Sequence, residues 1–465
     1  MKTKIKLNQA LTATLLLTVL LTTQTGCERM SSRQTESSAV QNQIQSGTPD
    51  PLRIVLAPLG GSTGLDKQIA QAQEQARTAV DPIVALEKLG WLFIAKARVS
   101  FDPGFYKLAE QCGLALGALE PHSPEALLLR GYAMQNLHQF KAAEPLAREL
   151  VARRGRAFDY GLLGDVLMEQ GRLDEAVAAY QQMADLKPDP QAYTRAAHMR
   201  WLKGDLEGAL EVMQMAVQAA SPRDPESAAW VNTRMALYQL QAGDFEKCRQ
   251  HCKAALEFQK NYPPALLADG RLLLAENNFA DALDPLRLAE KLNPLPEYQW
   301  TLADALRAAG QIGEAADIEN RIKTQGIAAD PRTCALFLAT RGDDVLTAVN
   351  LARAELQTRG DVITHDVLAR SLAAAGCWNE AETEVQLALA EGTQDARLFL
   401  HAGIVAAKFS RTADAEKFLG QAANLQQMLL PSEREQLKNV SATLSHQQAN
   451  SNQTKNQNTK ERSHT

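Results

Sequence analysis

Over most of the chain, apolar residues recur at the spacing of helices, and the pattern returns at a fixed interval. The stretch from Tyr160 to Pro188 shows it most clearly. Tyr160, Leu163 and Leu167 fall on one face of a first helix, and Gly171 permits the turn that ends it. A second apolar face follows, and Pro188 stops that helix because proline cannot continue the hydrogen-bond ladder. The pattern therefore predicts two short helices in each unit.

A small residue marks the second helix of each unit, and its recurrence sets the repeat. Apart from one step of 39 residues, the markers follow one another every 33 or 34 residues. The long step contains the polar stretch SPRDPE, which a loop can absorb. Ten units at one pitch predict an array of about ten helix pairs. The markers are Ala109, Ala143, Ala176, Ala209, Cys248, Ala282, Ala315, Ala348, Ala381 and Ala415.

The order of large residue, Leu-Gly, large residue, then alanine, aromatic residue and proline resembles the tetratricopeptide repeat (TPR). The resemblance covers about residues 82–427. It implies an all-α fold, a right-handed superhelical α-solenoid of about ten TPR-like helix pairs, which binds partner proteins on its concave surface. Because Gly164 and Ala176 are small, we expect two helices to approach closely there.

The N-terminal residues have the pattern of a bacterial export signal. A basic start precedes the apolar run LTATLLLTVLL, which is short for a membrane span. The run ends at TQTGC and resembles the lipobox of bacterial lipoproteins, with Cys27 as the lipidated residue, although Gln24 stands where the family usually has an aliphatic residue. With Glu28 next, the resemblance implies a periplasm-facing, lipid-anchored protein of the outer membrane. A soluble exported product and an uncleaved anchor are the alternatives.

The chain outside the repeats divides by composition. A Ser/Gln/Thr-rich stretch predicts a tether, and a polar C-terminal stretch of low complexity predicts disorder. Leu52–Pro58 is β-prone and indicates a lone strand or a cap, and Leu65–Val80 predicts a helix. The expected plan is a signal peptide at 1–27, a tether at 28–50, an N-terminal cap region at 51–81, the solenoid at 82–427, a capping helix at 428–442 and a disordered tail at 443–465.

Charge and motifs argue against two functional classes. The formal net charge of −5 does not favour general nucleic-acid binding, so we expect no nucleic-acid partner. The sequence holds no GxSxG, HExxH or GxxxxGK[ST] motif, so we expect neither catalysis nor a cofactor. Cys248, His251 and Cys252 share a helix, but Cys248 occupies the small-residue position, and we expect packing rather than a metal site.

One enzymatic alternative stays open. His365, Asp366 and His401 fall on the first helices of neighbouring units, where they could form a hydrolase or metal site. A packed histidine is the competing interpretation, because His365 takes the position that Tyr160 has earlier in the array.

The inner face of the first helices predicts the binding site. Positions about 100° round from the contact within a pair point to the concave side. Tryptophan and arginine are favoured anchors of protein interfaces, although large residues there also pack against the next unit. The sequence therefore predicts a non-catalytic scaffold, tethered to the envelope, that binds a peptide or helix of an unidentified partner protein; a soluble periplasmic adaptor is the alternative. The expected groove residues are Met168, His198, Trp201, Trp230, Arg271, Trp300, Asp304 and Arg307.

Overall fold

The computed structural model describes residues 50–462, and from Pro51 onward the chain forms one compact unit. These residues form α-helices and one short 3-10 helix, with no strand among them. None of the described helices is both long and apolar enough to cross a membrane. The export signal, Cys27 and the tether expected up to residue 49 lie outside the described residues.

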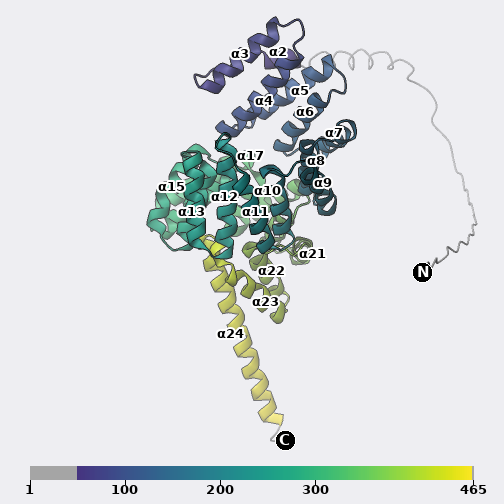
Figure 1. Ribbon diagram of the computed structural model, residues 1–465. Helices are drawn as coiled ribbons and strands as arrows, with labels where there is room; N and C mark the ends of the chain where they lie inside the picture. The colour runs from purple at the N-terminus through teal and green to yellow at the C-terminus, as the bar shows by residue number, and fades with distance from the viewer. Residues whose placement is uncertain (1–49, 463–465) are drawn as a thin grey trace, which may run out of the picture. The chain divides into compact units, whose positions relative to one another are not determined.

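Twenty helices of the described chain form ten consecutive pairs. Figure 1 colours the described chain in sequence order, from α2 and α3 in purple to α24 in yellow. The first five pairs are α4 (Ile83–Ser100) with α5 (Gly104–Leu119), α6 (Pro124–Asn136) with α7 (Phe140–Arg153), α8 (Ala157–Glu169) with α9 (Leu173–Leu186), α10 (Pro190–Leu202) with α11 (Leu206–Ala219), and α12 (Pro225–Ala242) with α13 (Phe245–Phe258). The last five are α14 (Pro263–Ala275) with α15 (Phe279–Leu292), α16 (Pro296–Ala308) with α17 (Ile312–Ala329), α18 (Pro331–Arg341) with α19 (Val345–Leu356), α20 (Val362–Ala374) with α21 (Trp378–Leu389), and α22 (Ala396–Lys408) with α23 (Thr412–Asn424).

The small marker residues lie where the two helices of a pair meet. Each of the ten sits on the second helix of its pair and has an exposed fraction of 0%. At Gly164 on α8, an added Cβ atom would lie 2.5 Å from Tyr180 Cδ1 and 3.0 Å from its Cζ on α9. The absence of a side chain at Gly164 therefore sets the helix separation. The expected all-α solenoid of ten helix pairs is confirmed.

The described segment before the array forms two helices and no strand. The β-prone run forms helix α2 (Pro51–Val55), so the expected lone strand is wrong and the capping alternative describes it better. The reason is tertiary: Val55 is buried, and Gln73 Nε2 on α3 (Gly64–Thr78) donates to the carbonyl oxygens of Val55 and Ala57 at 2.8 Å each. These bonds satisfy the end of a helix too short to be stable alone.

The C-terminal helix runs further than the sequence suggested. After the 3-10 helix η1 (Gln426–Met428), α24 spans Pro431–Arg462, so it crosses the boundary expected between a capping helix and a disordered tail. Leu437 and Leu444 are buried with residues of α22 and α23, which continues the packed face beyond residue 442. Helix α24 therefore begins as a packed element and not only as a polar cap.

The array closes on itself between pairs that are six apart. The Gly360 N–H, before α20, donates to the Glu169 carbonyl oxygen at the end of α8 (3.1 Å). One pair further along both segments, Thr393 Oγ1 donates to the Leu202 carbonyl oxygen (2.5 Å). The loops approach so closely that a Cβ atom on Gly360 would lie 2.8 Å from the Gln170 carbonyl oxygen. These contacts join the ninth and tenth pairs to the third and fourth.

Helix α24 extends this closure to the middle of the array. Ser432 Oγ donates to Asp304 Oδ2 on α16 (2.5 Å), and Arg397 Nε on α22 donates to Glu433 Oε1 (2.6 Å). Arg434 donates to the carbonyl oxygen of Leu274 on α14 (2.6 Å). The concave side of the central pairs is therefore partly filled by the chain's own C-terminal helices.

Candidate partner-binding cavities

Two cavities open on the inner side of the array. Cavity 1, of about 570 Å³, lies between α8, α10 and α12 on one side and α20, α22 and η1 on the other. Cavity 2, of about 680 Å³, lies between α4, α6, α8, α10 and α12. Both have the size of ordinary ligand pockets. Met168, His198 and Arg234 line both cavities, so the two are neighbours with a common wall.

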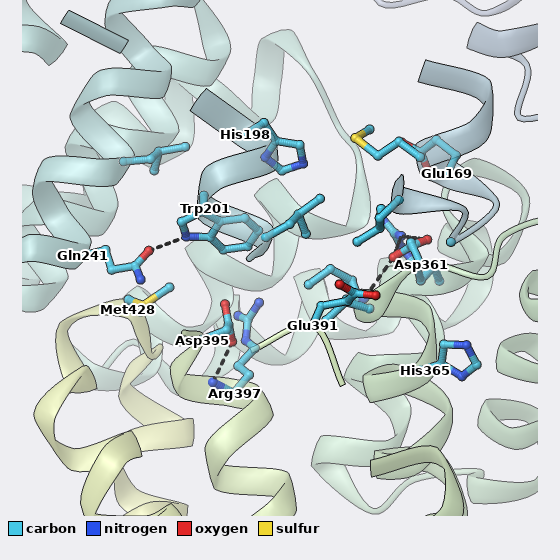
Figure 2. Close-up of a pocket in the computed structure, with 18 of the residues that line it drawn as sticks. Glu169, His198, Trp201, Gln241, Asp361, His365, Glu391, Asp395, Arg397 and Met428 are labelled. Atoms are coloured by element: carbon cyan, nitrogen blue, oxygen red, sulfur yellow. Dashed lines mark hydrogen bonds and ion pairs between the residues drawn. The ribbon is translucent and has the colours of Figure 1, made fainter. Parts of the chain in front are cut away.

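Trp201 lies one helical turn after His198 and borders the common wall on the side of cavity 1. On α10, His198 stacks on Trp201 with 5.4 Å between the ring centres and 13° between the planes. Figure 2 labels both residues at cavity 1. Trp201 Nε1 donates to Gln241 Oε1 at 2.7 Å, and Gln241 Nε2 donates to the Gln394 carbonyl oxygen at 2.7 Å. The contact between the two parts of the array thus holds the Trp201 ring at the edge of cavity 1.

Charged side chains of cavity 1 are mostly engaged within the chain. Lys203 Nζ lies 2.5 Å from Glu391, and Arg332 lies 3.2 Å from Asp361. Burial raises the pKa of Asp395, although Arg397 opposes the shift. Figure 2 shows Asp361, Glu391, Asp395 and Arg397 around the same space. Cavity 1 therefore combines apolar walls with ion pairs, of which Lys203–Glu391 spans the closure.

Cavity 2 is rich in aromatic residues. Aromatic residues make up 5% of the chain, yet seven of them line this one cavity. Tyr132 and Phe158 stack with 5.7 Å between ring centres, and Trp230 keeps 39% of its surface exposed. Burial raises the pKa of Tyr106 to about 12, so its phenol stays neutral. Such walls accept flat apolar groups.

Two ion pairs stand in the wall of cavity 2. Arg195 on α10 contacts Asp165 on α8 with both prongs of its guanidinium, at 2.7 and 2.6 Å. Arg98 on α4 pairs with Glu226 on α12 and so joins the first pair of the array to the fifth. Burial lowers the pKa of His198 to about 3, and the charge of Arg234 adds to the effect, so this imidazole is neutral at pH 7.

Five of the eight expected groove residues line the cavities. Met168 and His198 line both, Trp201 and Arg271 line cavity 1, and Trp230 lines cavity 2. The inner-face geometry of the first helices therefore placed these side chains on the concave side. Whether they bind a partner stays a prediction.

The other three expected groove residues lie elsewhere. Trp300 has an exposed fraction of 2% under the Arg397 guanidinium, 5.2 Å from the ring centre, so the expectation of an exposed ring is wrong. Asp304 is 1% exposed and pairs with Arg341 at 2.5 Å. Arg307 donates to Glu319 at 2.8 and 2.5 Å and lines neither cavity. Helices α22 and α24, which return to α16, cover this part of the concave side.

The residues of the enzymatic alternative do not form one cluster. His401 Nδ1 donates to Asp366 at 2.8 Å in the interior, where His401 is 3% exposed. His365 instead donates to Glu384 on α21 at 2.6 Å. Within residues 50–462, no group of three or more His, Cys, Asp or Glu side chains is placed to hold a metal ion.

The cysteines follow the packing interpretation with one exception. Cys248 and Cys252 are buried and free on α13, while His251 Nδ1 lies 3.0 Å from Asn232 Oδ1. Cys377, which directly precedes α21, is free and exposed.

Sequence reasoning missed Arg234 and the tyrosines of cavity 2. Arg234 lies one helical turn after Trp230 on α12 and therefore on the same inner face. Following that face four residues beyond Trp230 would have identified Arg234. Tyr262 gave no such signal, because it precedes α14 and enters the cavity only through the winding of the array.

The comparisons with known proteins bear on the repeat. A search of curated proteins finds no match. Among solved structures, the human IFIT1 dimer with PPP-AAAA is 14% identical and covers 78% of this chain and 77% of that chain, with a TM-score of 0.38. Yeast Tom70 is 13% identical and covers 83% and 96%, with a TM-score of 0.38.

The repeat itself is matched directly. The family model described as the tetratricopeptide repeat matches residues 128–189, 162–225 and 267–331. These matches fall on the second to fourth pairs and on the sixth and seventh pairs of the structure. These segments of the chain therefore carry tetratricopeptide repeats, within an array of ten helix pairs.

Proposed function

We propose that the protein is a non-catalytic scaffold of the bacterial envelope that binds a segment of a partner protein in the two inner cavities. The observation that carries the proposal is that the cavities adjoin along Met168, His198 and Arg234, which gives one continuous binding surface on the first helices of the repeats. Aromatic and arginine side chains on that surface are the residue types that dominate protein interfaces.

The capture experiment compares tryptophans inside and outside the cavities. Epitope-tagged wild type and the variants Trp201→Ala, Trp230→Ala and Trp378→Ala are purified from detergent-solubilised envelopes, and captured proteins are identified by mass spectrometry. Trp378 on α21 serves as the matched control because it lines neither cavity. Each variant must first show wild-type helicity and melting.

We expect Trp201→Ala and Trp230→Ala to lose the partner that wild type and Trp378→Ala retain. Hot-spot truncations cost about 2 kcal/mol or more, roughly a thirtyfold loss of affinity. Equal capture by all four proteins would place the binding surface outside the cavities. Nuclease treatment of the captured material tests the expectation that no nucleic acid takes part.

The membrane anchor is a separate part of the proposal. The export signal and the sequence TQTGC ending at Cys27 support lipidation of that cysteine. Intact mass of the purified protein should show a chain that begins at Cys27 and carries lipid, and Cys27→Ser should release the protein into the periplasmic fraction. An unlipidated mature chain would leave a soluble periplasmic adaptor, and retention of Met1 would indicate an uncleaved anchor.

A further inference from the structure

Cavity 2 holds a positive charge that the described residues do not neutralise. Three arginines and two acids line it. Arg98 pairs with Glu226 and Arg195 pairs with Asp165, which accounts for both acids. Among the described residues, no carboxylate pairs with the third arginine, Arg234. The wall of cavity 2 therefore carries one net positive charge.

The contacts of Arg234 leave most of its donors unused. A guanidinium has five N–H donors. Of the three guanidinium nitrogens of Arg234, only Nη2 has hydrogen-bond partners among the described residues. These are the Nδ1 atom of His198 and the hydroxyl of Tyr238, both at 3.4 Å. Neither partner carries a negative charge. Both distances are longer than the donor–acceptor distance of about 2.7–3.2 Å that protein hydrogen bonds usually have. Its Cζ atom lies 5.4 Å from the Tyr238 ring centre, which orients the guanidinium plane.

The groups around this charge define what it accepts. Trp230 lies one turn before Arg234 on α12 and is 39% exposed in cavity 2, and the stacked rings of Tyr132 and Phe158 line the same cavity. A carboxylate would form strong charge-assisted bonds with the unused donors, while a flat ring would pack on the aromatic wall. A basic ligand is disfavoured, because both acids are already paired.

We infer that cavity 2 binds a partner segment in which one aspartate or glutamate side chain stands next to an aromatic side chain. Arg234 binds the carboxylate, and the aromatic wall takes the ring. This inference rests on the proposed scaffold function and specifies the partner's chemistry.

Capped peptides test the inference without knowledge of the partner. Isothermal titration of the purified chain compares three peptides with the same Gly/Ser frame, each acetylated and amidated, that carry Asp-Phe, Asn-Phe or Asp-Ser at the centre. The Asp-Phe peptide should bind about tenfold or more tightly than the Asn-Phe peptide, since a hydrogen bond to a charged group contributes about 1.5–3 kcal/mol. The Asp-Ser peptide should lose affinity through the missing ring.

Two variants assign the preference to one side chain. Arg234→Gln should abolish the discrimination between Asp-Phe and Asn-Phe. Arg287→Gln is the matched control, because Arg287 pairs with Glu314 on the outer helices at 2.7 Å and lines neither cavity; it should leave the discrimination intact. As a second readout, the bound Asp-Phe peptide should raise the pKa of His198 in an NMR titration, because its carboxylate offsets the charge of Arg234.

The outcomes separate this inference from the scaffold proposal. Equal affinity of wild type for the Asp-Phe and Asn-Phe peptides, no measurable binding of the Asp-Phe peptide, or discrimination that survives Arg234→Gln would overturn the inference. It is also overturned if an uncapped peptide ending in phenylalanine binds better than the Asp-Phe peptide, because the carboxylate would then be a chain terminus. Any of these results together with capture that depends on Trp230 would leave the scaffold proposal standing.

Discussion

The close contact at Gly164 gives a sharp test of how the pairs are packed. A Cβ atom added there would lie 2.5 Å from Tyr180 Cδ1, and ordinary contact begins at 3.4 Å, so the ring or the whole of α9 must retreat by about 1 Å in Gly164→Ala. The movement also pulls on the Tyr180 hydroxyl, which donates to Asp165 at 2.8 Å. Since Asp165 also holds Arg195, the strain reaches the wall of cavity 2.

The expected change in the free energy of unfolding of Gly164→Ala follows from two opposing effects. Overpacking costs about 1–3 kcal/mol, and replacing a helical glycine by alanine returns about 0.5–1 kcal/mol. We expect Gly164→Ala to lower the free energy of unfolding by about 1 kcal/mol, the midpoint of a range that ends at about 2.5 kcal/mol. The loss should be larger if the bond from Tyr180 to Asp165 is broken.

The same substitution elsewhere supplies the control. Gly420 lies inside α23, is exposed, and has no atom within 4 Å of an added Cβ. Gly420→Ala should therefore raise stability by about 0.5–1 kcal/mol. Urea unfolding followed by circular dichroism measures both, with the midpoint and the slope compared separately. If Gly164→Ala is at least as stable as wild type while Gly420→Ala behaves as expected, the packing of Tyr180 over Gly164 is wrong.

Three further predictions follow from the structure. Gly360→Val should separate the closing loops, because even a Cβ atom would lie 2.8 Å from the Gln170 carbonyl oxygen. Small-angle scattering should then show a larger radius of gyration, and an unchanged radius would contradict the closure. His198 has a pKa of about 3 in the folded chain against 6.5 in the unfolded chain, so the unfolded state takes up a proton first on acidification. The free energy of unfolding should therefore fall from about pH 6.5 downward. His198→Gln should reduce that loss, as urea titrations at about pH 7 and 5 would show. In a Cys27→Ser background, a maleimide should label folded protein at Cys377 alone, as peptide mapping would show, because the other described cysteines are buried.

The repeat could be predicted because its signals are local. Helical spacing, glycine after a first helix and a small residue on the second helix are each decided within one unit, and all ten markers proved buried. The first helices also point their side chains inward by simple geometry, which explains why Trp201 and Trp230 lie in cavities.

The closure could not be predicted from those signals. It depends on small rotations between neighbouring pairs that add up over six pairs, and no single position records that sum. Trp300 has the pattern of an exposed inner residue, yet Arg397, which covers it, comes from α22. Asp304 likewise meets Ser432 of α24, 128 residues away in the chain. That no carboxylate of the described residues pairs with Arg234 also needed the structure, because it depends on which acids the other arginines contact.

The closing contacts have a consequence for the order of folding. Repeat arrays normally fold through contacts between neighbouring units, which are local in sequence and therefore fast to form. Thr393 and Leu202 are 191 residues apart, and Lys203 and Glu391 are 188 apart. Bringing such distant segments together costs loop entropy that only a largely formed array can reduce. During synthesis, the third and fourth pairs must therefore wait for the ninth and tenth, and until then the Trp201 ring of cavity 1 is open to chaperones and to premature partners.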